Sequence, residues 1–381
     1  MPSRDQTVER YKTGRTIVSM EVRVVSLREL TDEDLAGWNR CAADALEANP
    51  FFEPDWLLTA LGRLGESPTA SVVLVGRGDT IDAVVPVADV VADGPGAAGP
   101  ESHAALLTRV APTAVALGTP LITAEGGLDA ATCLLTALVC EAEHRGAGLV
   151  VMEWLGDDGP VVELLREAAA RTDRHLIEFD SWDRALLRRG DGVGTGDGQP
   201  YWLRGIGKNR RRTIRQHRRH LAAALGSDLV VRRRTDTAAV DRFLALEASG
   251  WKGQAADGLA FGRESCSTLF FEDVCCRYLR SGRMWFASLE GPDAPIAMIC
   301  LVRAGNGVFA YRTAYDESYA KHGPGVEVFL AAMEQFVQDE DAGWLDTCSA
   351  PGNDHLLGLF PDRHAMATLM VRVPSACGGV E

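Results

Sequence analysis

GVFAYRTAYDESYAKHGPGVEVFLAAMEQF, residues 307–336, is the stretch that decides the fold. Its first part alternates in the manner of a β-strand, and its last part has the apolar spacing of an amphipathic helix. Gly323 and Gly325 stand just before that helix. At a helix start, unpaired backbone N–H groups and the positive end of the dipole attract anions, and glycine lets a phosphate approach closely. The stretch therefore predicts either an ordinary helix-entry turn or a seat for phosphate.

The charges around the glycines favour phosphate in this half of the chain only. Lys321 and His322 would add positive charge beside the turn. A corresponding stretch in the first half, AEGGLDAAT, keeps the glycines but carries Glu125 and Asp129, which would repel a diphosphate. If one half binds a phosphorylated cofactor, we expect it to be the second.

The bulk composition is that of an ordinary globular protein. The 381 residues, 46% apolar and 24% charged, are enough for two domains and a large core. The polar N-terminus lacks the apolar stretch of a secretory signal, and no run of 18 apolar residues occurs, so we expect a cytoplasmic protein. A net charge of -14 argues against a protein that wraps duplex nucleic acid with a general basic surface.

The nine cysteines are odd in number and show no paired CxxC spacing. Most fall inside apolar runs such as ATCLLTALVC and IAMICLV. This pattern predicts reduced thiols in the core, with neither disulfides nor a metal site.

Strand-like and helix-like segments alternate along the chain, which indicates a mixed α/β fold. ASVVLVGRGDTIDAVVPVADV in the first half and RMWFASLEGPDAPIAMICLVRA in the second both suggest two strands around a short turn, and a helix, a glycine and a strand follow in each half. RRGDGVGTGDGQP suggests a loop or linker. The predicted parts are a flexible segment at 1–19, a first domain at 20–187, a linker at 188–199 and a second domain at 200–373.

Four segments in order resemble a known family. They are NPFFEPDW (49–56), GKNRRRTIRQHRRHL (207–221), LEASGWKG (246–253) and FAYRTAYDESYAKHGPG (309–325). Together with the strand, glycine turn and helix, they resemble the GNAT N-acetyltransferase fold, and more specifically the CelD-like (BioF-type) bacterial acyltransferases. Those proteins carry tandem GNAT-like domains and are distantly similar to the Fem aminoacyl-tRNA transferases. The resemblance covers most of residues 20–373.

The resemblance implies that the second domain binds acetyl-CoA or another acyl-CoA and that the first shapes the acceptor site. The usual GNAT signature starts with Gln or Arg, where this chain has Ala320, so one side chain directed at the phosphates is missing. The strand at 307–315 would supply backbone donors to the pantetheine and the carbonyl. The implied cofactor-binding residues are Tyr311, Thr313, Lys321, Gly323, Gly325 and Val326.

Acyl transfer to an amine needs a deprotonated amine, a polarised carbonyl and a stabilised thiolate. Asp316 and Glu317 are candidates for the base or for holding a cationic amine, and the alternative is a solvated turn that caps the next segment. His322 and His355 are alternative bases. Arg312 stands where the relatives commonly have lysine; it keeps the charge but cannot transfer a proton at neutral pH.

Trp251 and Lys252 follow a helix-like run and are flanked by glycines. Because lysine is rarely buried and tryptophan at a helix break often lines a cleft, we expect both to face the substrate. The alternative is a core tryptophan beside a surface lysine.

KNRRRTIRQHRRH, residues 208–220, is expected to form a basic helix whose apolar side holds Ile214. Its partner could be the 3'-phosphate side of coenzyme A, an anionic acceptor or a tRNA acceptor stem, with Arg210 and Arg211 as candidate contacts. A solvated basic helix is the other possibility.

Three functions therefore stay open. The first is an acyl-CoA-dependent N-acyltransferase that acts by direct attack on a small-molecule amine or amino sugar and needs no metal. The second is an aminoacyl-tRNA-dependent transferase, and the third is a non-catalytic binding protein on a degenerate GNAT scaffold.

Overall fold

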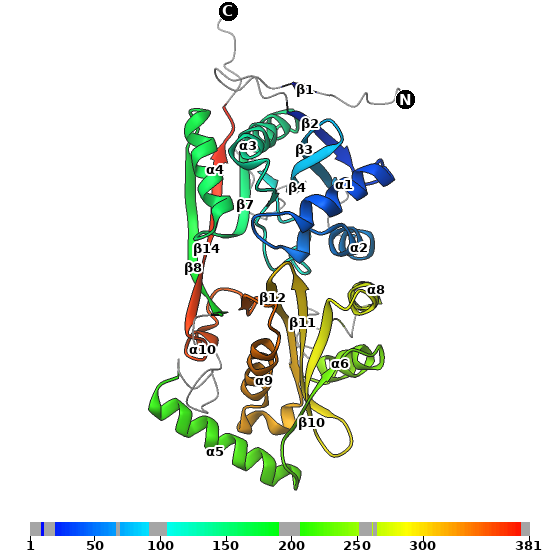
Figure 1. The fold of residues 1–381 in the computed structure, drawn as a ribbon, viewed down its shortest axis with the longest axis vertical. Helices are drawn as coiled ribbons and strands as arrows, with labels where there is room; N and C mark the ends of the chain where they lie inside the picture. The colour runs from blue at the N-terminus through cyan, green and yellow to red at the C-terminus, as the bar shows by residue number, and fades with distance from the viewer. Residues whose placement is uncertain are drawn as a thin grey trace, which may run out of the picture. The chain divides into compact units, whose positions relative to one another are not determined.

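The computed structural model describes residues 9–10, 20–65, 69–90, 105–189, 206–250, 261 and 265–374. Trp251, Lys252 and most of the predicted linker lie outside these ranges. The fold is mixed α/β, as the sequence predicts (Figure 1). Within the described ranges, every helix is too short or too polar to cross a bilayer.

Contacts within the chain divide it into two units. The first comprises Met1–Trp182 and Ala365–Glu381, and the second comprises Asp183–His364. The limits of this division fall inside two strands, β8 (Leu176–Arg188) and β14 (Asp362–Arg372). The domain limits expected from the sequence stay a prediction.

In the first unit the strand order is β1-β2-β3-β4-β5-β7-β14, and β6 pairs with β4. The strands are β1 (Glu9–Arg10), β2 (Glu21–Ser26), β3 (Ser71–Arg77), β4 (Thr80–Val90), β5 (Ala105–Leu107), β6 (Leu121–Ile122) and β7 (Leu149–Gly156). The helices are α1 (Asp32–Ala43), η1 (Pro50–Phe52), α2 (Pro54–Leu64), α3 (Gly127–His144) and α4 (Pro160–Arg171). Helix α1 begins where Thr31 and Asp34 form a capping box, and α2 has proline at its first position.

In the second unit the strand order is β8-β13-β12-β11-β10-β9. The strands after β8 are β9 (Val230–Arg234), β10 (Met284–Glu290), β11 (Pro295–Ala304), β12 (Gly307–Tyr315) and β13 (Trp344–Asp346). The helices are α5 (Lys208–Leu225), α6 (Ala238–Ser249), α8 (Ser265–Arg280), η3 (Glu317–His322), α9 (Pro324–Gln338) and α10 (Asp354–Leu357). Helix α9 covers one face of β10–β12, and α6 and α8 cover the other (Figure 1).

The two units repeat one order of elements. The first has β2, α1, α2, β3 and β4, followed later by α3 and β7. The second has β9, α6, α8, β10 and β11, followed later by α9 and β13. This confirms the internal repeat that the two halves of the sequence predict.

The pairing of β12 changes along its length. It pairs with β11 in antiparallel fashion from end to end, with an irregularity in register at Cys300/Leu301. With β13 it pairs in parallel only through Gly307–Phe309, opposite Trp344–Asp346. Because β13 ends there, β12 continues past it toward η3 and the first turn of α9.

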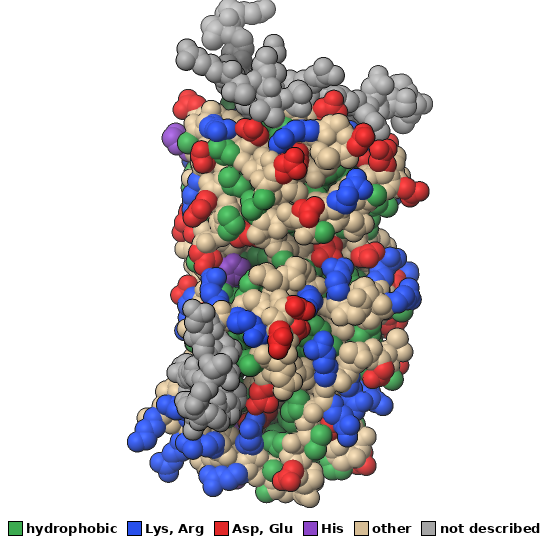
Figure 2. All heavy atoms as spheres, viewed as in Figure 1, with side chains coloured by type: hydrophobic (Ala, Val, Ile, Leu, Met, Phe, Trp, Pro, Cys, Tyr) green, Lys and Arg blue, Asp and Glu red, His purple; other side chains and the backbone are tan. Residues whose placement is uncertain are grey.

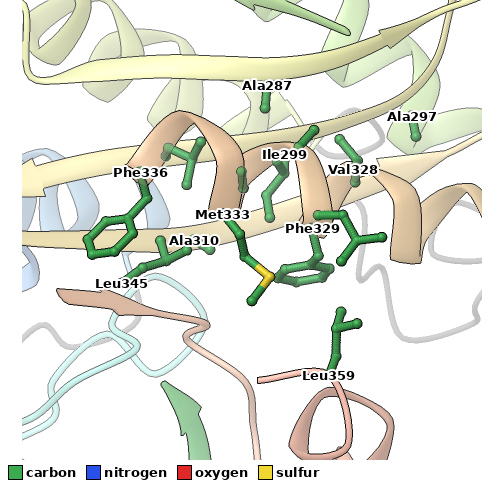
Figure 3. Packing of buried hydrophobic residues seen from close by; sticks show 14 of the residues in the cluster. Ala287, Ala297, Ile299, Ala310, Val328, Phe329, Met333, Phe336, Leu345 and Leu359 are labelled. Atoms are coloured by element: carbon green, nitrogen blue, oxygen red, sulfur yellow. The ribbon is translucent and has the colours of Figure 1, made fainter. Parts of the chain in front are cut away.

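Helix α9 is fixed by a continuous apolar core. Its residues Val328, Met333 and Phe336 are all buried in this core. Figure 3 shows the Met333 side chain beside the ring of Phe329, with Leu359 close by. The same packing holds the first turn of α9 at the end of β12.

We expect Met333→Ala to lower the free energy of unfolding by about 2–5 kcal/mol, because it leaves a cavity under α9. Met333→Leu keeps the volume and should cost less than about 1.5 kcal/mol. Urea denaturation followed by circular dichroism measures both. Equal stability of the alanine variant and the wild type would show that α9 is not held by this core.

Candidate active site

The candidate site is where β12 leaves β13 and leads into η3 and α9. Strand β12 ends at Tyr315, and residues 317–322 form the 3-10 helix η3. Gly323, with a φ of 65°, ends η3 and is also the N-cap of α9. Pro324 follows at the first helical position, where its missing N–H costs nothing. Two helix ends thus meet at the glycine that the sequence singles out.

The amides of this turn are largely bonded within it. The N–H of Gly323 donates to the carbonyl of Ala320 at 3.0 Å, and that of Val326 donates to the carbonyl of Gly323 at 3.0 Å. No side chain caps α9. Among the described residues, the structure gives no hydrogen-bond acceptor for the N–H of Gly325. The turn therefore offers an anion one amide, the positive end of α9 and the nearby Lys321.

Helix α5 lies beside this turn. A Cβ added at Gly323 would be 3.2 Å from Nδ1 of His217, and the ring centroids of His220 and His322 are 6.1 Å apart. Partial loss of water and the neighbouring charges of Lys321, His220 and His217 lower the pKa of His322. His322 is therefore a neutral imidazole at neutral pH, suited to accepting a proton but not to adding charge for a phosphate.

A buried carboxylate ties α5 to α9. Arg218 Nε donates to Glu327 Oε2 at 2.8 Å, and the Glu327 side chain is only 2% exposed. Burial raises the pKa of Glu327, although the neighbouring Arg218 opposes the rise.

Arg312 is also held by a buried carboxylate. Its Nε donates to Glu247 Oε1 at 2.6 Å, and its Cζ lies 3.6 Å from the centroid of the Phe261 ring. The other oxygen of Glu247 accepts the N–H of Phe261 at 2.9 Å. Glu247 thus joins α6, the segment at residue 261 and β12.

Sequence reasoning missed Glu247 as a site residue, although it lies in LEASGWKG. The available signal was its spacing from Ala239 and Phe243, which continues the buried side of α6 into an acidic residue. A carboxylate at such a position needs a cationic partner.

The other candidates are placed as follows. Asp316 Oδ1 accepts the Ser318 N–H at 2.9 Å, which is the capping role weighed as an alternative. Glu317 follows it, exposed, in the first turn of η3. Tyr311 and Thr313 lie on β12, and desolvation by burial raises the pKa of Tyr311.

The two arginines predicted to contact substrate lie at the start of α5. Arg210 Nη2 donates to the carbonyl of His355 at 2.6 Å, which fixes α5 to α10. Arg211 is half-buried, and its Nε is buried without a hydrogen-bond partner among the described residues. The roles assigned to all these residues stay predictions.

Residues 208–351 match an acetyltransferase (GNAT) domain. The match runs from α5 to just beyond β13 and contains every candidate residue named from the sequence except His355. It confirms the GNAT resemblance for this part of the chain. No curated protein matches the chain.

Solved structures share the fold over most of the chain. FemX is 10% identical, with a TM-score of 0.56 over 88% of this chain and 95% of that one. A conserved protein of unknown function from Bacteroides thetaiotaomicron VPI-5482 is 11% identical, with a TM-score of 0.55 over 92% of this chain and all (100%) of that one. The C-terminal domain of a putative lysylphosphatidylglycerol synthetase from Agrobacterium fabrum is 9% identical, with a TM-score of 0.51 over 90% and 92%. At these identities the likeness shows the fold alone.

The raised pKa of Glu327 predicts a pH dependence of stability. A carboxyl whose pKa is higher in the folded chain contributes stability below its unfolded pKa and loses it as pH rises through the folded pKa. We therefore expect the stability of Glu327→Gln relative to wild type to increase as the pH rises above about 4.

Urea denaturation at several pH values measures this difference. Glu340→Gln, at an exposed position just after α9, is the matched control and should follow the wild-type curve. Parallel curves for Glu327→Gln and wild type would contradict the burial argument.

Proposed function

We propose that this protein transfers an acetyl or other acyl group from acyl-CoA to an amine of a small molecule or amino sugar. The observation that carries the proposal is the separation of β12 from β13 after Phe309 and Asp346, with the first turn of α9 at the end of β12. A thioester lying along β12 would have its phosphates near the Gly325 amide and Lys321. The match of residues 208–351 to a GNAT domain supports this placement.

Direct attack by the amine fits the thiols of the second unit. Burial raises the pKa of Cys275 and of Cys348, so both are held as thiols and not as the thiolates that a covalent intermediate requires. In this proposal the carbonyl is polarised by backbone donors of β12. The cofactor contacts are Tyr311, Thr313, Lys321, Gly323, Gly325 and Val326, with Asp316 and Glu317 near the incoming amine.

We expect Gly325→Glu to abolish acetyl-CoA binding measured by calorimetry, because it puts bulk and negative charge where phosphate would lie. The protein should still fold, since a Cβ at this position meets only the Tyr315 ring at 3.4 Å. Gly62→Glu, at an exposed helical glycine with nothing within 4 Å, is the control. Unchanged affinity of Gly325→Glu would refute the assignment.

A second candidate, an aminoacyl-tRNA-dependent transferase, is favoured by the exposed side of α5. Lys208, Arg212, Arg215 and Arg219 are exposed and spaced so that they form one stripe along the helix. Figure 2 shows Lys and Arg side chains gathered at the lower left of the view, where Figure 1 places α5. Among the described residues, the structure gives these four no acidic partner. Such a stripe suits a phosphate backbone.

Binding experiments with acetyl-CoA and with tRNA distinguish the two candidate functions in the wild-type protein. Micromolar binding of acetyl-CoA supports the first function. No binding, together with a salt-sensitive mobility shift of tRNA that is lost in Arg212→Gln/Arg215→Gln/Arg219→Gln, supports the second. Arg242→Gln, an exposed arginine on α6, is the control. Failure of both tests leaves a non-catalytic binding protein.

A further inference from the structure

A buried ionic cluster lies at the end of β13. Asp346 Oδ2 is 2.8 Å from Nδ1 of His364, and Asp346 Oδ1 is 3.5 Å from Nη1 of Arg184. The side chains of Asp346 and Arg184 are 0% exposed, whereas that of His364 is 14% exposed. The imidazole is therefore the member of the cluster that water or a ligand can reach.

The cluster lies at the point where the two strands separate. Asp346 is opposite Phe309, the last pair between β13 and β12. Leu345 packs in the core with α9, so Asp346, the next residue along the strand, projects from the opposite face of the sheet. Arg312, whose partner Glu247 is on α6, lies on that face too.

Asp346 also holds the turn that follows β13. Asp346 Oδ1 accepts the N–H of Cys348, which holds that residue at a φ of 53°. A non-glycine residue in this region costs about 1–3 kcal/mol, so the bond to Asp346 stabilises a strained turn.

The cluster orients the histidine. The nearby Arg184 and the hydrogen bonds from His364 and Cys348 lower the pKa of Asp346 against the effect of burial. Asp346 is therefore a carboxylate that can only accept, and Nδ1 of His364 must donate to it. This fixes the tautomer in which Nε2 carries the lone pair, the arrangement in which a carboxylate prepares an imidazole to take a proton.

We propose that His364, positioned by Asp346, is the general base for acyl transfer; this rests on the function proposed above. As the amine nitrogen bonds to the thioester carbonyl carbon, its proton moves to Nε2 of His364. The C–S bond then breaks, and the imidazolium returns the proton to the leaving thiolate. Asp346 and Arg184 act as positioning residues.

The two charged residues that precede His364 in the sequence, Asp362 and Arg363, have hydrogen-bond partners of their own. Asp362 Oδ2, on the same strand, accepts the N–H of Arg188 at 2.7 Å. The guanidinium of Arg363 donates to the carbonyls of Leu357 and Phe360. Asp346 of β13, which Arg184 of β8 contacts in turn, is an ionic partner of the imidazole.

The test is His364→Asn, whose side-chain amide can still donate to Asp346 but has no group in the place of Nε2. Thiol release from acetyl-CoA is measured with glucosamine and simple alkylamines as acceptors. We expect kcat to fall by about 100-fold or more, with unchanged acetyl-CoA affinity, and the acidic limb of the pH–rate profile to disappear. His175→Asn, at an exposed position before β8, should leave kcat and the profile unchanged.

Each outcome either supports or refutes His364 as the general base. Wild-type kcat and pH profile in a folded His364→Asn protein would overturn the assignment while leaving the proposed function in place. Wild-type protein that binds acetyl-CoA but releases no thiol with any acceptor counts against the proposed function, and the inference falls with it. If His364→Asn does not fold, recovery of turnover in His364→Gly on adding imidazole supports the assignment, and its absence refutes it.

Discussion

The separation of β12 from β13 is the constraint on which the candidate site depends. The two strands share three parallel pairs. Beyond the last pair, β13 has ended and β12 continues without it toward the start of α9. The core beneath α9 fixes where that helix begins. As a result, the unpaired edge of β12, the N-terminus of α9 and the Asp346–His364 pair all lie around the point where the two strands separate.

Buried carboxylates hold the surrounding elements together. Glu247 joins α6 to β12 through Arg312, Glu327 joins α9 to α5 through Arg218, and Asp346 joins β13 to β8 and β14. Removing one partner of such a pair leaves a buried charge, which typically costs about 3–5 kcal/mol. The same pairs that stabilise the second unit therefore also fix the positions of the residues assigned to binding and chemistry.

Local patterns predicted much of this fold. The strand at 307–315, the capping box at Thr31 and the repeated order of elements follow from periodicity and capping chemistry. The 3-10 helix η3 did not, because a polar segment such as ESYAKH has no strong periodicity. Glu247 and His364 were missed for another reason. The partner of Glu247 is 65 residues away and that of His364 is 18 residues away, so only the tertiary fold brings each residue to its partner.

Arg218 adds positive charge to α5 and also binds this helix to α9 through Glu327. Moving α5 away from α9 would leave the buried carboxylate of Glu327 without its guanidinium partner, which costs free energy. Under the proposed function, an anion on the outer side of α5 and a cofactor at the first turn of α9 would therefore lie on two helices that share one ion pair.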